Sequence, residues 1–192
     1  TQEKMVRLPL PRKEGRLSLE STLYLRRSIR EYLPLPLKID EASSLLWAAY
    51  GKNKYNKLTS PSAGALYPLR IYVLVGDVEE IPTGFYRYDN TYHALIELSK
   101  NDLREELCRA ALNQSYIKDA PFVILICADY GITTSVYGDR GRRYVDIEVG
   151  HVGQNIYLEA TSLNLGTVAI GAFNDEVVKR IFRIKEEPVY IM

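Results

Sequence analysis

The sequence predicts an α+β protein in which helices flank a mixed or antiparallel central sheet. Helical and strand-like segments intermix along the chain without the regular alternation that a parallel sheet requires. The continuous apolar run 122–128, opened by Pro121, is typical of a strand buried on both faces. The chain has 192 residues and no composition shift that would mark a linker, so we predict one domain over residues 1–192.

The overall charge argues against a nucleic-acid partner. Lys and Arg number 25 and Asp and Glu number 24, which leaves a net charge of +1. The longest apolar run is too short to span a bilayer, and the polar N-terminus has no signal-peptide pattern. Cys108 and Cys127 lie in apolar surroundings without the spacing of metal ligands. We therefore expect a cytoplasmic protein with two reduced cysteines and no membrane contact.

Caps and prolines predict the elements of the first third of the chain. Residues 1–17 contain two prolines and no periodic pattern, so we expect an extended N-terminal arm. A short helix is expected over residues 18–25, and Pro34 favours an extended chain soon afterwards. Asp40 is expected to cap the next helix and Gly51 to end it.

Strand and helix patterns then intermix to the end of the chain. β-Branched and aromatic residues predict strands at residues 70–76, 84–88, 92–98, 122–128, 167–170 and 189–192. Helices are expected from residue 101 or 102 to 111, over residues 146–163, and after the cap residue Asn174. Residues 130–143, which contain several Gly and Tyr, are expected to form a connection.

Three arginines and a serine gather where the first helix is expected to end. Arg26, Arg27, Ser28 and Arg30 lie within five residues. Guanidinium groups bond phosphate oxygens in pairs, so this cluster suits an anion with several oxygens. The alternative is a set of solvated cations that only complement the negative end of the helix dipole.

Two stretches of small residues could bring backbone close to a flat ligand. Residues 60–68 contain Pro61, Ser62, Ala63 and Gly64, and residues 166–172 contain Ala169, Ile170, Gly171 and Ala172. Glycine allows close approach of the backbone, and its neighbours leave N–H and C=O groups accessible. The alternative for each stretch is a tight turn, for which glycine is equally suited.

The common catalytic motifs are missing from the chain. It has no GxGxxG, Walker A, GxSxG or HExxH sequence, which argues against Rossmann and P-loop enzymes. His93 is expected on a strand at the surface. Glu148 and His151 have the Glu-x-x-His spacing of di-iron sites, but no second such pair is present, so we predict no metal site. With Asn155 they are expected to form a polar stripe on a buried or subunit-contacting face.

Four motifs in one order resemble a known family. The chain is similar to the FMN-dependent nitroreductase superfamily, and within it to the SagB-type branch of thiazole/oxazole dehydrogenases. The resemblance extends from about Ser18 to the end of the chain. It rests on the stretches Arg26-Arg27-Ser28-Ile29-Arg30, Pro61-Ser62-Ala63-Gly64-Ala65-Leu66-Tyr67-Pro68, His151-Val152-Gly153-Gln154-Asn155 and Val168-Ala169-Ile170-Gly171-Ala172-Phe173.

The resemblance implies a nitroreductase-like fold, an intertwined homodimer and two FMN sites at the subunit interface. Arg26, Arg27 and Ser28 would hold the phosphate of FMN, and Arg30 would lie by the N1–C2=O edge of the ring. Two further groups would contact the ring: Pro61, Ser62, Ala63 and Gly64 from the other subunit, and Ala169, Ile170, Gly171 and Ala172 on the N5 side.

The chain departs from the azoline-oxidising members of the branch at two places. Where they carry a Lys-Tyr pair, this chain has Val136 and Tyr137, and a valine cannot accept a proton. Tyr137 is therefore the only candidate proton donor. The sequence ends at Met192, where relatives continue with a basic residue that reaches the phosphate.

The resemblance implies transfer of hydride from NAD(P)H through FMN to a small acceptor. Three alternatives remain. The chain could be a peptide azoline dehydrogenase that acts with a cyclase partner. It could be a flavin-binding or partner-binding protein without turnover, or a structural dimer without cofactor.

Overall fold

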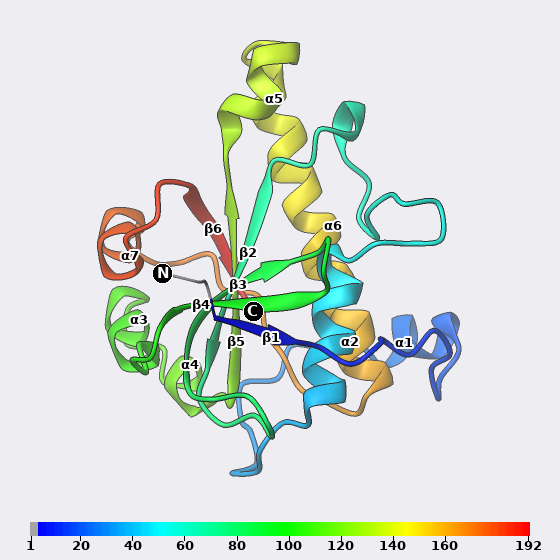
Figure 1. Cartoon of the computed structure of the whole chain (residues 1–192), viewed down its shortest axis with the longest axis vertical. Coiled ribbons are helices and arrows are strands. Elements are labelled where there is room, and N and C mark those ends of the chain that lie inside the picture. The colour runs from blue at the N-terminus through cyan, green and yellow to red at the C-terminus, as the bar shows by residue number, and fades with distance from the viewer. Residues whose placement is uncertain (1–3) are drawn as a thin grey trace.

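A six-stranded antiparallel sheet forms the centre of the computed structural model, which describes residues 4–192 (Figure 1). The strand order is β1-β4-β3-β2-β5-β6, and every neighbouring pair is antiparallel. This confirms the predicted α+β class and selects the antiparallel alternative. The strands are β1 Met5–Arg7, β2 Leu69–Val75, β3 Gly84–Asp89, β4 Ala94–Ser99, β5 Phe122–Ala128 and β6 Glu187–Ile191.

Helices cover both faces of the sheet. The side that carries α2 and α6 appears on the right of Figure 1, and α3, α4 and α7 lie on the left. Among residues 4–192, no helix has the length and apolar character needed to cross a membrane. The helices are α1 Leu19–Leu25, α2 Ile39–Tyr50, α3 Arg104–Ala110, α4 Tyr116–Asp119, α5 Tyr130–Tyr137, α6 Arg140–Ser162 and α7 Asp175–Phe182, with a 3-10 turn at Ala63–Ala65.

The interior strand β5, which lies between β2 and β6, contributes to two hydrophobic cores. All seven of its residues are buried, which confirms the predicted buried strand. Ile124 and Ile126 lie in the core with α2 and α6, whereas Leu125 and Cys127 lie in the core with α3, α4 and α7. The alternation follows from strand geometry, because successive side chains point to opposite faces of a sheet.

The side-chain cap that the sequence predicts is confirmed for α7 but not for α2. Ser18 caps α1 by accepting the N–H of Ser21 at 3.1 Å, and Asn174 caps α7. Gly51 ends α2 as expected. The prediction of Asp40 as the cap of α2 is wrong. The carboxylate of Glu41 accepts the backbone N–H of Lys38 at 2.9 Å, so the helix begins two residues earlier than an Asp40 cap allows.

The predicted connection at residues 130–143 is wrong, because most of it is helical. α5 begins after Asp129, whose carboxylate accepts the N–H of Gly131 at 3.0 Å. Gly138, with φ of 59°, turns the chain into α6, which starts at Arg140 rather than at residue 146. A Cβ on Gly141 would lie 2.9 Å from the backbone of Thr133. The glycines therefore allow two helices to pack closely, and they do not mark a loop.

Two predicted strand assignments are also wrong. Residues 167–170 form no strand, since only Ile170 pairs there, through two backbone hydrogen bonds with Ile191. β4 starts at Ala94, and His93 lies in the preceding turn with φ of 48°. Asp89 widens that turn by accepting the N–H groups of the second and third residues after it. Short strand Met5–Arg7, within the predicted arm, pairs with β4, and residues 1–3 of the arm lie outside the described residues.

His93 is half-buried and is not the free surface residue that the sequence predicts. Its Nε2 lies 2.7 Å from Ser43 Oγ on α2 and 3.1 Å from the carbonyl of Pro9. Its Nδ1 lies 2.8 Å from the hydroxyl of Tyr88, and burial lowers its pKa. The neutral imidazole therefore joins the N-terminal arm to α2 and β3.

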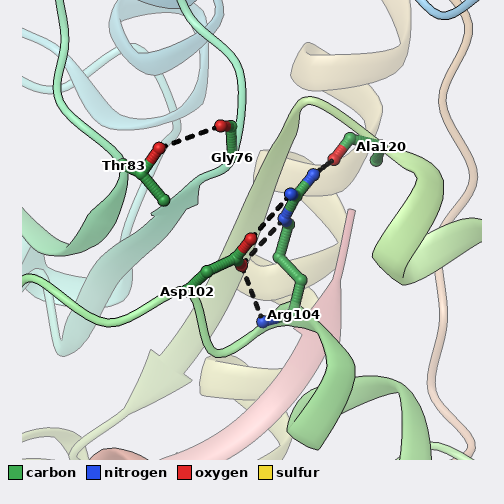
Figure 2. Close-up of polar contacts among 5 residues, drawn as sticks. All are labelled: Gly76, Thr83, Asp102, Arg104 and Ala120. Carbon is green, nitrogen blue, oxygen red and sulfur yellow. Dashed lines mark hydrogen bonds and ion pairs between the residues drawn. The ribbon is translucent and has the colours of Figure 1, made fainter.

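Arg104 fastens the start of α3 to the chain that enters β5 (Figure 2). Its guanidinium bonds both carboxylate oxygens of Asp102, at 2.7 and 2.9 Å, and the carbonyl of Ala120 at 2.6 Å. The pair lowers the pKa of Asp102. Gly76 lies against the guanidinium, where a Cβ would come within 1.9 Å of Arg104 Cζ. Only glycine at this position leaves the guanidinium in place.

Candidate functional site

The arginine segment leaves α1 in an extended conformation and lies along the residues that follow α6. The N–H of Ile29 donates to the carbonyl of Thr167 at 2.9 Å. The guanidinium of Arg26 lies 4.9 Å from the centre of the Tyr157 ring, which fixes its direction. Arg27 and Arg30 are exposed. Two of the three cationic groups are therefore open to an anion from solvent.

Tyr157 of α6 joins the arginine segment to the second small-residue stretch. Its hydroxyl lies 2.8 Å from Ser28 Oγ and accepts the N–H of Ala169, also at 2.8 Å. Tyr157 is not among the site residues predicted from the sequence. One signal was available: Tyr157 comes four residues after Gly153, so it continues one face of the helix that carries the His151-Val152-Gly153-Gln154-Asn155 motif.

In the stretch 169–172, the main chain is more accessible to a ligand than the side chains are. Ile170 is buried, so only its main chain is available to a ligand, whereas Gly171 and Ala172 are exposed. The carbonyl of Ala172 accepts a hydrogen bond from the Nε2–H of Gln114 at 3.0 Å, which connects the stretch to the loop before α4. A Cβ on Gly171 would lie 3.5 Å from the Tyr190 ring.

A second tyrosine stands beside the arginine segment. The hydroxyl of Tyr32 donates to the carbonyl of Ile29 at 3.0 Å. Burial, followed by the neighbouring Tyr116 and Tyr157, raises the pKa of Tyr32 to about 12, although Arg30 opposes the rise. Tyr32 therefore stays protonated at neutral pH and holds the extended backbone in place.

The Pro61–Gly64 stretch lies at the other end of α6 and meets Tyr137. Gly64 has φ of 60°, a conformation that favours glycine, and is exposed. A Cβ there would lie 2.8 Å from the Tyr137 hydroxyl. Ser62 Oγ accepts the N–H of Tyr67 at 2.9 Å and closes the turn. The structure thus brings two predicted site residues, Gly64 and Tyr137, into contact.

Polar residues of α6 anchor this stretch to α2. Asn155 donates to Ser60 Oγ at 3.1 Å and to the carbonyl of Ala48 at 3.0 Å. Glu148 is 2% exposed and accepts the hydroxyl of Tyr50 at 2.7 Å. Glu148 and Asn155 are thus on the packed side of the helix, whereas His151 is exposed. Within residues 4–192, no three His, Cys, Asp or Glu side chains gather in a way that could hold a metal ion.

We expect Glu148→Gln to be more stable than the original protein at high pH. Burial raises the pKa of Glu148, although the hydroxyls of Ser62 and Tyr50 and the nearby His151 oppose the rise. A raised pKa in the folded state means that stability is complete below the unfolded value of about 4.3 and falls as pH rises through the folded value. Glutamine can still accept from Tyr50 but does not ionise.

Thermal unfolding at pH 4 and pH 8 measures this effect. The Tm of Glu148→Gln minus that of the original protein should be larger at pH 8 than at pH 4. The increase should be about 2–4 °C for each kcal/mol of unfolding free energy that the original protein loses when Glu148 ionises. The exposed Glu79→Gln serves as the control and should show no such trend. A Tm difference that is constant between the two pH values would contradict the expectation.

In the single chain the predicted site residues form two separate groups. None of the hydrogen bonds between described residues 4–192 joins the Arg26–Arg30 segment to the Pro61–Gly64 stretch. Each group is open to solvent, with guanidinium groups in the first and exposed backbone at Gly64 in the second. Guanidinium groups are suited to binding an anion, and backbone at a glycine allows close approach of a ligand, so the two groups offer different kinds of contact.

Comparison with known proteins gives one family and close relatives. The model of the nitroreductase family matches residues 23–192. A protein of Methanocaldococcus jannaschii named as a nitroreductase is 50% identical over 177 residues, which cover 92% of this chain and 89% of the relative. A crystal structure of a protein named as a nitroreductase from Ralstonia eutropha has a TM-score of 0.85 at 30% identity and covers 98% of this chain and 87% of its own.

A more distant relative is longer than this chain. The trifolitoxin operon protein TfxC of Rhizobium leguminosarum is 25% identical over 185 residues. The match covers 87% of this chain but only 52% of the relative, so the chain spans about half the length of that protein.

Proposed function

Because this chain belongs to the nitroreductase family, we propose that it is an FMN-dependent oxidoreductase that transfers hydride from NAD(P)H to a small acceptor. The family supports an oxidoreductase, and the arginine segment supports a phosphorylated flavin. The observation that carries the proposal is that one hydroxyl, that of Tyr157, forms hydrogen bonds with both Ser28 and Ala169 and so joins the arginine segment to the stretch 169–172. We further propose that residues 1–192 act as one domain, in the cytoplasm, where the buried Cys108 and Cys127 remain thiols.

The residues around Tyr157 would each bind a different part of the cofactor. Arg26, Arg27 and Ser28 would bind the phosphate, and Arg30 would lie beside the N1–C2=O edge of the ring. The backbone of residues 169–172 would face the N5 side. When bound, FMN supplies the hydride chemistry, and the protein positions substrate and adjusts the charge around the ring.

We propose that two chains form an intertwined homodimer and that Pro61, Ser62, Ala63 and Gly64 reach the ring from the partner. The separation of the two groups in one chain supports this arrangement. So does an uncovered apolar surface on α1 and the segment after it, where large side chains are 51–89% exposed. These residues are Leu19, Leu23, Tyr24, Leu25, Leu33 and Leu35.

Tyr137 is our candidate proton donor. Its hydroxyl touches the position of Gly64, and its side chain is 38% exposed, so a substrate can reach it. Val136 beside it is 60% exposed but cannot accept a proton, which favours reduction of a small acceptor over oxidation of a peptide azoline. The four ordered motifs and the likeness to TfxC still support a place near the SagB-type branch.

An absorption spectrum of the purified protein, followed by anaerobic NADH and then NADPH, tests the proposal. We expect a yellow protein, after reconstitution with FMN if needed, whose visible absorbance bleaches with at least one donor. A yellow protein that neither donor bleaches would contradict the NAD(P)H half of the proposal. A colourless protein that neither binds FMN nor gains thermal stability from it would overturn the proposal that FMN is the cofactor. A ligand at a hundred times its Kd adds about 2.7 kcal/mol to the free energy of unfolding, so its binding would be visible.

A further inference from the structure

A cleft of about 610 Å³ opens on the face of the sheet that carries α3, α4 and α7. Its floor consists of Tyr72 on β2 and Phe85 on β3. The end of α7 and the residues after it form one wall, and the connection from β4 to α3 forms the other. None of the residues that line it belongs to the candidate flavin site. Its volume lies within the range of small-molecule sites, about 300–1,000 Å³.

The floor of the cleft is aromatic. Tyr72 and Phe85 stack with ring centres 5.4 Å apart and planes inclined by 22°. Phe85 also meets Phe182 of α7 at 4.7 Å. Leu98 on β4 adds an apolar side chain that is 47% exposed. The three rings are themselves only 2–5% exposed, so the apolar surface open to a ligand is that of Leu98, Ile181 and Ile184 above them.

The rim of the cleft is cationic. Arg87, Arg183 and Lys185 line it, and none of the three forms an ion pair with another residue in the described range 4–192. Glu186 is the one carboxylate in the lining, and its Oε2 already accepts the hydroxyl of Tyr72 at 3.0 Å. An excess of positive charge in a cleft with apolar walls concentrates anions there.

We propose that this cleft is a second ligand site, which binds a small anion with an aromatic or other apolar body. Leu98, Ile181 and Ile184, which line the cleft and are at least partly exposed, would cover the body. The guanidinium groups of Arg87 and Arg183 would bond the oxygens of a carboxylate, sulfonate or phosphate. The site is independent of the flavin chemistry, because it shares no residue with the arginine segment or with Tyr157.

Calorimetric titration with 8-anilino-1-naphthalenesulfonate tests the site in the whole protein with saturating FMN present. The probe carries an aromatic body and one sulfonate. We expect Arg87→Gln and Arg183→Gln each to raise its Kd roughly tenfold, as loss of a hydrogen bond to a charged group does. The matched control is Arg180→Gln, since Arg180 is exposed on α7, three residues before Arg183, but does not line the cleft; the Kd of this variant should change less than twofold.

A neutral probe of similar shape, N-phenyl-1-naphthylamine, tests binding of the apolar body separately from binding of the anionic group. It should bind more weakly than the sulfonate, and its Kd should be unchanged by Arg183→Gln. Failure of the sulfonate to bind would overturn the site. Equal losses in Arg180→Gln and Arg183→Gln would also overturn it, because they would indicate general surface charge. If Arg87→Gln does not fold, Arg183→Gln and Lys185→Gln on the exposed rim still decide the outcome.

Discussion

Replacing Arg26 and Arg27 together with alanine is expected to raise the Kd for FMN by at least a hundredfold. A hydrogen bond to a charged group contributes about 1.5–3 kcal/mol, and a factor of ten in Kd corresponds to about 1.4 kcal/mol. Tyr157 already holds the guanidinium of Arg26 by a contact of 4.9 Å, so little side-chain entropy remains to be lost on binding. Calorimetric or fluorescence titration of the apoprotein measures the change.

Riboflavin, which lacks the phosphate, makes this expectation specific. The double variant should bind riboflavin as well as the original protein does, because the lost contacts would be to phosphate alone. Exchanging the exposed pair Arg12 and Lys13 for alanine provides the charge-matched control and should leave both Kd values within twofold. A loss that is equal for FMN and riboflavin would contradict a phosphate role and would indicate a damaged fold.

Features set by neighbouring residues were predictable from the sequence. Asn174 caps α7 through the N–H group three residues further on, and the run Phe122–Ala128 is apolar enough to require burial on both faces. The arginine segment and the stretch 169–172 are each visible in the sequence as separate motifs. Each of these signals is complete within about ten residues, so no knowledge of the tertiary structure is needed to detect it.

Features that depend on distant residues were not predictable in this way. Tyr157 bonds Ser28 across 129 positions and Ala169 across 12. Its place four residues after Gly153 puts it on the motif face of the helix, but neither partner can be identified from the residues near it. The same reason explains the error at residues 130–143. Gly141 packs against the backbone of Thr133, and only the packed structure shows that this glycine belongs to a helix and not to a loop.

Arg30→Ala is expected to lower the reduction potential of bound FMN by about 60 mV. Reduction places negative charge near N1 of the ring, and a preorganised cation beside that edge stabilises the reduced form by about 3 kcal/mol. For a two-electron couple, 30 mV corresponds to about 1.4 kcal/mol, which gives the expected shift. Arg30 already affects its surroundings, since it opposes the rise in the pKa of Tyr32. Anaerobic titration against a reference dye at saturating FMN measures the potential.

Arg30→Lys distinguishes the charge of Arg30 from its shape. A lysine keeps the positive charge but lacks the planar fork, so the potential should fall between those of the original protein and Arg30→Ala. Tyr32→Phe is the second control, because it removes the hydroxyl that bonds the carbonyl of Ile29 and leaves the cation in place. If Tyr32→Phe lowers the potential as much as Arg30→Ala does, the backbone conformation is the cause, and the guanidinium does not act directly on the ring. A potential unchanged in Arg30→Ala would remove Arg30 from the N1 edge altogether, while leaving Arg26 and Arg27 as the phosphate site.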